Sequence, residues 1–307
     1  MTRYKSSRAC RSVKNSIILV SSIAHLAAGG ELSADQSTIE SLTGKCIKYV
    51  NQVPNCKYRY IVHYENNVYR EFSKFDDRFY IKEFANEKYD QLVQSVSFDG
   101  KHYYHLTTQL DEKYLVIGSN VSIAAWAFRS YFVSNPLYEP FSFFVPNYEG
   151  FSLPLIAFPD GWLRASSNGM MPVNIILNQA GQRGDLVYKY RKDDANDYLI
   201  KFRLNEETPY SVAGKYRDTS FTWATNGVEL KQLRNGKQFK IPKFSEYVAR
   251  NAQNSIIPNM TRTIKLDSGS FEEIPADPGL SVYQVGIDIA NEIYDADLGA
   301  LIKTREN

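Results

Sequence analysis

The chain has 307 residues, of which 43% are apolar, 23% are charged and 14% are aromatic, a composition that excludes disorder as its main state. Its 36 basic and 34 acidic residues nearly balance, so a nucleic-acid-binding role lacks the positive surface that it needs. Twenty-two Tyr and 17 Phe favour strands over a helical bundle, because aromatic side chains suit a pleated, half-buried surface.

The N-terminal segment, residues 1–30, has the three parts of a cleaved secretory signal peptide. Basic residues without an acidic one occupy 1–15, an apolar run follows over 17–28, and small residues come next. The run is shorter than the ~20 residues that cross a bilayer. We therefore predict a soluble mature chain in the periplasm or outside the cell. A helix that packs on the fold or anchors it in a membrane is the alternative.

Two cysteines follow this segment, and an even number in an exported chain predicts a disulfide between Cys46 and Cys56. The bridge would close a short loop and contribute roughly 2–3 kcal/mol. Two buried free thiols are the alternative. Redox chemistry is disfavoured because the spacing is not that of a Cys-x-x-Cys pair.

The first predicted elements are a helix and a strand meander. Ser37 and Glu40 have the spacing of a capping box, which predicts a helix over about 37–50. From Lys57 the period changes to two, the alternation of a β-strand. Further strands are expected at 68–75, 77–84, 91–98, 101–108 and 112–118, and their close spacing predicts consecutive antiparallel pairing.

The middle of the chain changes character. An apolar segment from about 120 to Val133 predicts a second helix, which would pack on the concave face of the sheet. Residues 136–171 are rich in Pro and aromatic side chains, and we interpret them as a loop that covers a hydrophobic cavity.

A second run of strands is expected after this loop, with hairpin turns at the dipeptides Asn226-Gly227 and Asn235-Gly236. A short helix is expected near 282–290. The predicted strands are 172–178, 185–191, 197–204, about 211–225, 228–234, 237–250 and 255–267.

Several short sequence segments follow one another in the order found in one known family. They are the Tyr58-Arg59-Tyr60 strand, Asp99-Gly100-Lys101 before an aromatic strand, and the stretches Leu204–Pro209, Phe221–Trp223, Gly236–Pro242 and Phe271–Tyr283. With an exported start and an opening helix, the chain resembles the LolA/LppX superfamily of periplasmic lipoprotein carriers over about residues 36–290. The resemblance implies one α+β domain over 31–307, mainly antiparallel β, in which an unclosed, curved half-barrel wraps around helices on its concave face.

No catalytic or metal-binding motif stands out, and we expect neither enzymatic activity nor a cofactor. His102 and His105 are three apart on a predicted strand, so their side chains point to opposite faces. Gly150–Pro154 lacks the second glycine of a nucleophile elbow. Asp193, Asp194 and Asp197 lack the spacing of a calcium loop.

The aromatic residues are the feature with functional meaning. Buried in a curved sheet, they would form a core or line a cavity that binds an acyl chain at about 0.8 kcal/mol per CH₂ group. The cavity candidates are Tyr58, Tyr60, Val62, Phe72, Trp126, Phe128, Phe144 and Phe158. The sequence thus predicts an exported non-catalytic protein that binds a lipid or lipoprotein acyl chain. The alternative is a structural or protein-interaction module of the cell envelope without a small ligand.

Overall fold

The structure is a computed structural model. It describes residues 31–32, 52–120, 135–137, 147–148, 151–152, 170–177, 183–193, 196–203, 211–216 and 218–304. Most of these residues lie in β-strands. The predicted signal segment and the predicted helix at 37–50 lie outside them, as does nearly all of the predicted helix at 120–133. None of the helices found among the described residues is long and apolar enough to cross a membrane.

Seventeen strands form a single open sheet. One half runs, in order of pairing, through β1 (Glu31–Leu32), β10 (Met170–Leu177), β11 (Arg183–Asp193), β12 (Asn196–Arg203), β13 (Ser211–Tyr216), β14 (Thr219–Gln232), β15 (Gln238–Arg250) and β16 (Arg262–Leu266). The sheet continues from β16 through β2 (Cys56–His63), β3 (Asn67–Phe75), β4 (Arg78–Phe84), β5 (Leu92–Phe98), β6 (Tyr103–Gln109), β7 (Glu112–Gly118), β18 (Glu292–Asp295) and β19 (Ala300–Thr304).

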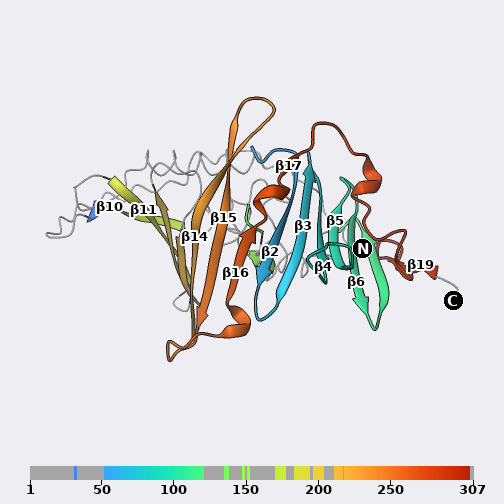
Figure 1. The fold of residues 1–307 in the computed structure, drawn as a ribbon. Helices are drawn as coiled ribbons and strands as arrows, with labels where there is room; N and C mark the ends of the chain where they lie inside the picture. The colour runs from blue at the N-terminus through green and yellow to red at the C-terminus, as the bar shows by residue number, and fades with distance from the viewer. Residues whose placement is uncertain are drawn as a thin grey trace, which may run out of the picture.

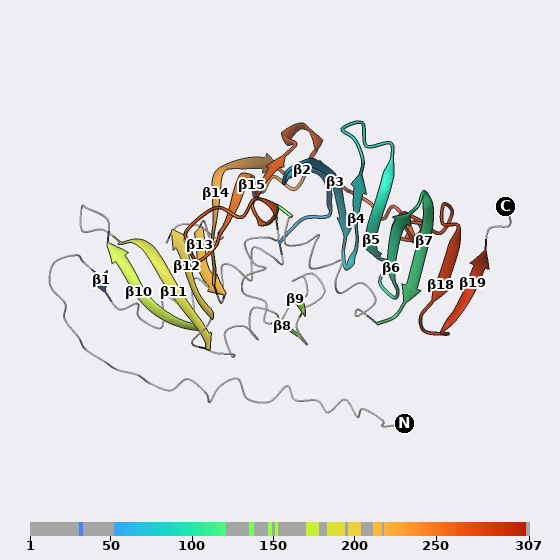
Figure 2. The ribbon, with the colours of Figure 1, turned by 90° about the horizontal axis from the view of Figure 1, so that it is seen from below.

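The sheet follows an arc, with β1 at one end and β19 at the other (Figure 2). The two-residue strand β17 (Glu272–Glu273) pairs with β2 beyond the end of β16, as the view along the front of the sheet shows (Figure 1). All pairs are antiparallel except β7 with β18, which is parallel. A separate hairpin, β8 (Asn147–Tyr148) with β9 (Phe151–Ser152), lies on the concave side of the arc (Figure 2).

The first meander forms where alternation predicts it. Strand β2 buries every second residue, and β3 to β7 follow it as consecutive antiparallel neighbours. The predicted turn at Asp99-Gly100 is confirmed. Gly100 has φ +96°, a left-handed conformation that glycine adopts at little cost. The Asp99 carboxylate accepts the backbone N–H groups of Lys101 and His102 at 2.9 and 2.7 Å, which closes the turn.

One predicted turn is wrong. Asn226-Gly227 lies inside β14 and not at a hairpin, because β15 pairs with β14 on both sides of the dipeptide, through Asn226 with Phe244 and Val228 with Pro242. Gly227 keeps a positive φ of 74° without reversing the chain. Continuous cross-strand pairing has overridden the local turn preference. The turn predicted at Asn235-Gly236 does form, at the end of the β14–β15 hairpin.

The predicted fold class, an α+β half-barrel around helices, is wrong. The structure is nearly all sheet, and its described residues contain 3-10 turns but no α-helix: η3 (Pro258–Met260), η4 (Ser268–Ser270) and η5 (Leu280–Val282). The helix expected near 282–290 is also absent, since only η5 and irregular turns occupy this part of the chain. Among the described residues, the parts of the chain that cover the sheet have irregular backbone, and side-chain contacts hold them in place.

Side chains divide the β2–β7 part of the sheet into two faces. The Tyr58 face carries Tyr58, Tyr60, Val62 and Phe72, and the Tyr80 face carries Tyr80, Tyr104, Leu106 and Leu115. Alternation in each strand assigns every residue to one face, and the cross-strand register carries the assignment to its neighbours.

The C-terminal segment, residues 277–299, packs on the Tyr80 face before it joins the sheet as β18. Its Tyr283 and Val285 pack with Tyr80, and its Ala290 and Ile293 pack with Tyr104, Leu106 and Leu115. One ion pair and two hydrogen bonds also hold this segment against the sheet. Arg78 pairs with Asp277 at 2.8 Å, Gln284 donates to Asp99 at 3.1 Å, and the side-chain oxygen of Asn291 accepts the Lys113 N–H at 2.8 Å.

Candidate functional site

The Tyr58 face brings together four of the eight predicted cavity residues. Tyr58, Tyr60, Val62 and Phe72 are each 0% exposed. Tyr58 lies directly opposite Phe72, and its ring centroid is 5.1 Å from that of Phe72 and 5.9 Å from that of Tyr60. These distances are typical of packed aromatic pairs. The other four, Trp126, Phe128, Phe144 and Phe158, lie outside the described residues.

A short segment outside the sheet contacts this face. Asn135 and Leu137 are fully buried, and the Tyr58 hydroxyl donates to the Asn135 side-chain oxygen at 2.5 Å. The same oxygen accepts the Leu137 N–H at 3.0 Å. Phe271, between η4 and β17, also stacks on the Tyr58 ring, with a distance of 6.4 Å between the ring centroids. The cover of the Tyr58 face therefore includes the beginning of the predicted covering loop.

The same face also carries charges that the sequence analysis did not single out. Arg70, only 3% exposed, pairs with Glu83, with its Nε 3.0 Å from the carboxylate, and Gln94 donates to the other carboxylate oxygen at 2.9 Å. Burial raises the pKa of the neighbouring Tyr60 hydroxyl, and the positive charge of Arg70 only partly opposes this. The alternation that places Phe72 on this face also places Arg70 there, so the sequence pattern could have indicated that Arg70 lies on the Tyr58 face.

His105 lies in an apolar row of the Tyr58 face, between Val96 and Val116. Burial lowers its pKa to about 4, so the imidazole is neutral near pH 7. His102 lies at the Asp99 turn, away from this row. Among the residues that the structure describes, no three metal-binding side chains come together.

A polar cluster lies on the opposite, Tyr80 face. Glu71 accepts hydrogen bonds from Tyr80 at 2.9 Å and Arg59 at 3.1 Å, and Lys57 Nζ lies 3.3 Å away. Burial alone would raise the pKa of Glu71. The charge of Lys57 and the hydrogen bonds from Tyr80, Arg59 and Lys57 outweigh it and hold the pKa below its usual range. Lys82, whose Nζ lies 4.4 Å from the Tyr80 ring centre, completes the cluster.

Cys56 is buried with a free thiol, and burial raises its pKa to about 12, so the thiol stays protonated. Cys46 lies outside the described residues. The free thiol of Cys56 does not agree with the predicted Cys46–Cys56 bridge and, for this residue, agrees with the alternative of buried free thiols.

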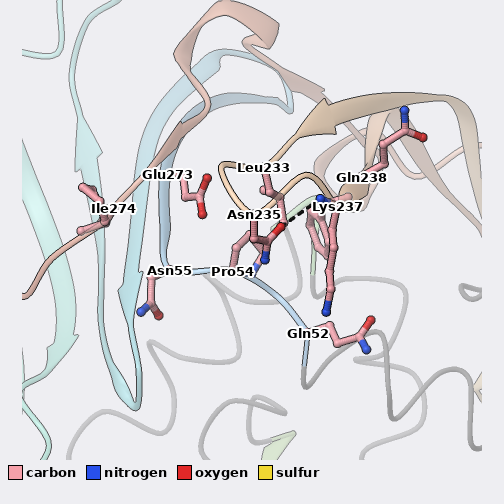
Figure 3. A pocket seen from close by; sticks show the side chains of 11 residues that line it. Gln52, Pro54, Asn55, Leu233, Asn235, Lys237, Gln238, Glu273 and Ile274 are labelled. Carbon is pink, nitrogen blue, oxygen red and sulfur yellow. Dashed lines mark hydrogen bonds between the residues drawn. The ribbon is translucent and has the colours of Figure 1, made fainter.

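A pocket of about 430 Å³ lies beside the start of β2 and the tip of the β14–β15 hairpin, in the middle of the strand order (Figure 3). Three segments meet there: the chain before β2, the end of the β14–β15 hairpin, and the chain after β17. The Ile274 N–H donates to the Asn55 carbonyl at 2.8 Å, and the Arg234 N–H donates to the Glu273 carboxylate at 2.7 Å. None of the predicted cavity residues lines this pocket. Its lining residues are Gln52, Pro54, Asn55, Leu233, Asn235, Lys237, Gln238, Phe239, Glu273, Ile274 and Pro275.

Comparison with known proteins assigns no family. No protein-family model matches the chain, and no curated protein matches it. Among solved structures, an uncharacterized conserved protein from Thermus thermophilus is 6% identical with a TM-score of 0.33, over 84% of this chain and 99% of the other. MucB in complex with MucA(peri) is 8% identical with a TM-score of 0.16, over 77% and 100%. At these scores neither similarity supports a shared fold or function, and the resemblance to LolA/LppX carriers stays a sequence-based prediction.

Proposed function

We propose that the protein is an exported, non-catalytic binding protein that holds an acyl chain of a lipid or lipoprotein against the Tyr58 face. The supporting observation is the buried cluster of three aromatic side chains and one aliphatic side chain, Tyr58, Tyr60, Phe72 and Val62, which is covered from outside the sheet at Asn135.

An acyl chain bound on the Tyr58 face would replace contacts that the cover now makes. The hydrogen bond between Tyr58 and Asn135 contributes about 1 kcal/mol. Each CH₂ group of a buried chain contributes about 0.8 kcal/mol. The acyl chain must also replace the burial of Leu137, so we expect a long chain, with many methylene groups, to bind and a short one not to. The four side chains of the Tyr58 face are fully buried. An acyl chain can therefore reach them only after the segment at Asn135 moves away from the sheet.

The test is binding of palmitate to the purified mature chain, compared between two isosteric variants. Val62→Thr places a hydroxyl on the Tyr58 face, and Val285→Thr places one at a similarly buried position against the Tyr80 face. We expect Val62→Thr to weaken palmitate binding about tenfold, since a hydroxyl buried against hydrocarbon costs roughly 1 kcal/mol or more. Val285→Thr should bind as the wild type does. Absence of palmitate uptake, or equal effects of both variants, would refute the proposal.

A second candidate function, protein interaction, is favoured by the outer strand β19. In the described residues β19 pairs only with β18. Leu301 and Ile302 are 51% and 52% exposed, and Leu298 beside them is 71% exposed. An exposed apolar edge of this kind accepts an added strand from a partner. A photo-crosslinking residue in place of Leu301 should capture a defined partner in an envelope extract, whereas one in place of Leu110, an exposed turn residue, should not.

A further inference from the structure

We propose that the pocket between the β14–β15 hairpin and the start of β2 binds a short peptide through its free C-terminal carboxylate. The pocket is separate from the Tyr58-face residues of the proposed function. Its volume, about 430 Å³, lies within the range of small-ligand sites.

The apolar wall of the pocket is suited to one side chain. Leu233 and Phe239 are 8% and 5% exposed, so they form a fixed floor. Pro54, Ile274 and Pro275 complete the wall. A buried Phe239 offers no open ring face on which a sugar could stack, which favours an aliphatic or aromatic side chain over a saccharide.

Some polar groups of the pocket are already used within the protein. Asn55 exchanges hydrogen bonds with Asp76, at 2.8 and 3.3 Å. The Asn235 side-chain oxygen accepts the Lys237 N–H at 2.9 Å, the contact drawn as a dashed line in Figure 3. One oxygen of Glu273 accepts the Arg234 N–H. These contacts fix the shape of the rim.

Other polar groups are left for a ligand. The Lys237 ammonium and the side-chain amides of Gln52 and Gln238 make no hydrogen bond or ion pair with any residue in the described ranges. Each amide presents two donors and one acceptor, which complement a peptide bond. A fatty acid could pair with Lys237 but would make no use of the two amides.

The charges of the pocket orient the peptide. Lys237 extends toward Gln52 and away from Glu273, which lies across the pocket on β17 (Figure 3). The carboxylate would therefore lie at the Lys237 and Gln52 end, and backbone N–H groups would point toward Glu273. Capture of a terminal carboxylate is a known mode of peptide recognition.

The experiment compares N-acetyl-Ala-Ala-Leu with a free carboxylate and the same peptide with a C-terminal amide, titrated into the full chain by calorimetry. We expect the acid to bind about tenfold more tightly than the amide, the gain of one charge-assisted contact. Lys237→Gln should abolish this difference. Lys240→Gln changes an exposed lysine of β15 that does not line the pocket, and it should preserve the difference.

Three results would overturn the proposal: no binding of the acid peptide, equal binding of acid and amide by the wild type, or an unchanged preference in Lys237→Gln. Glucuronate or decanoate that binds at this pocket in place of the peptide would assign it to another ligand class. The denaturation midpoint of Lys237→Gln should equal that of the wild type, because the side chain is exposed. Lys237→Gln should bind palmitate as the wild type does, because none of the Tyr58-face residues lines this pocket. This measurement distinguishes a failure of this proposal from a failure of the proposed function.

Discussion

Gly286 lies where the C-terminal segment comes closest to the sheet. Its φ is +103°, and a Cβ atom built on it would lie 3.0 Å from Leu106 Cδ1 and 3.2 Å from Leu115 Cδ1. An added methyl group would therefore meet both an unfavourable backbone conformation and two core side chains. Gly286 thus sets the distance between the segment and the Tyr80 face.

Gly286→Ala should lower the free energy of unfolding by about 2–4 kcal/mol, the sum of strain and overpacking. Gly279→Ala is the matched control, since Gly279 has φ +90° but no atom within 4 Å of the place that an added methyl group would take. It should cost about 1 kcal/mol, from strain alone. Urea denaturation of the two variants checks this, and equal losses would show that the contact with Leu106 does not constrain the segment.

His105 should make stability depend on pH. Its pKa is about 4 in the folded chain, below the value of 6.5 for an exposed histidine, so the unfolded chain binds more protons between these values. Stability contributed by neutral His105 is complete above pH 6.5 and is lost as pH falls toward 4, by about 3 kcal/mol.

His105→Leu should remove this part of the pH dependence, which is measured as the free energy of unfolding in urea at pH 7 and pH 4.5. His63→Gln is the control, because His63 is an exposed residue at the end of β2. If His105→Leu keeps the wild-type difference between the two pH values, His105 is not the group that titrates.

At the scale of elements, strands β3 and β4 are joined by the buried ion pair between Arg70 and Glu83, which lies on the Tyr58 face. Loss of one partner leaves the other charge buried, which costs about 3 kcal/mol or more. Arg70→Met or Glu83→Met alone should therefore destabilise strongly, and the double variant should recover part of the loss. A double-mutant cycle in urea measures this.

The Arg78–Asp277 pair provides a comparison, because its Asp277 side chain is 55% exposed. Asp277→Asn should cost about 1 kcal/mol or less. Additive losses from Arg70→Met and Glu83→Met would mean that the two side chains do not act as a pair.

Strand content and face could be predicted from the sequence, because both follow from local rules. Alternation places Tyr58, Tyr60 and Val62 on one side of β2 whatever the strand pairs with. Turn preference is weaker, as Asn226-Gly227 shows, since pairing with a long partner strand on both sides of the dipeptide prevents a chain reversal even though Gly227 keeps a positive φ. Arg70 shares the period of Phe72, but alternation alone does not indicate that a charge will be buried and paired.

At the scale of the whole molecule, the β7–β18 pair joins segments far apart in the chain. Asn291 and Lys113, which exchange hydrogen bonds of 2.8 Å, are separated by 178 residues. Contacts of this separation carry a large loop-closure cost, so they form late in folding. The C-terminal segment should therefore dock after the β2–β7 meander has formed.

Ile293→Ala should test this order. Ile293, in strand β18 of the C-terminal segment, is 3% exposed and packs in the core of the Tyr80 face, so its truncation should cost about 2–5 kcal/mol. Nearly all of the loss should appear as faster unfolding, with the folding rate almost unchanged. Ile289→Ala, at a residue that is 38% exposed, should change both rates little. A slower folding rate of Ile293→Ala in stopped-flow refolding would place the segment in the folding nucleus.

The sequence by itself determined the strands of the first meander, the hairpin at Asn235-Gly236 and the shared face of Tyr58 and Phe72, because each depends on residues that are neighbours in the chain or on consecutive strands. The tertiary structure alone decided what covers each face. Gly286 against Leu106, and Glu273 across from Lys237, meet only after the whole sheet has formed. Local periodicity records which side of a strand is apolar, but it carries no information about the distant segment that will bury it.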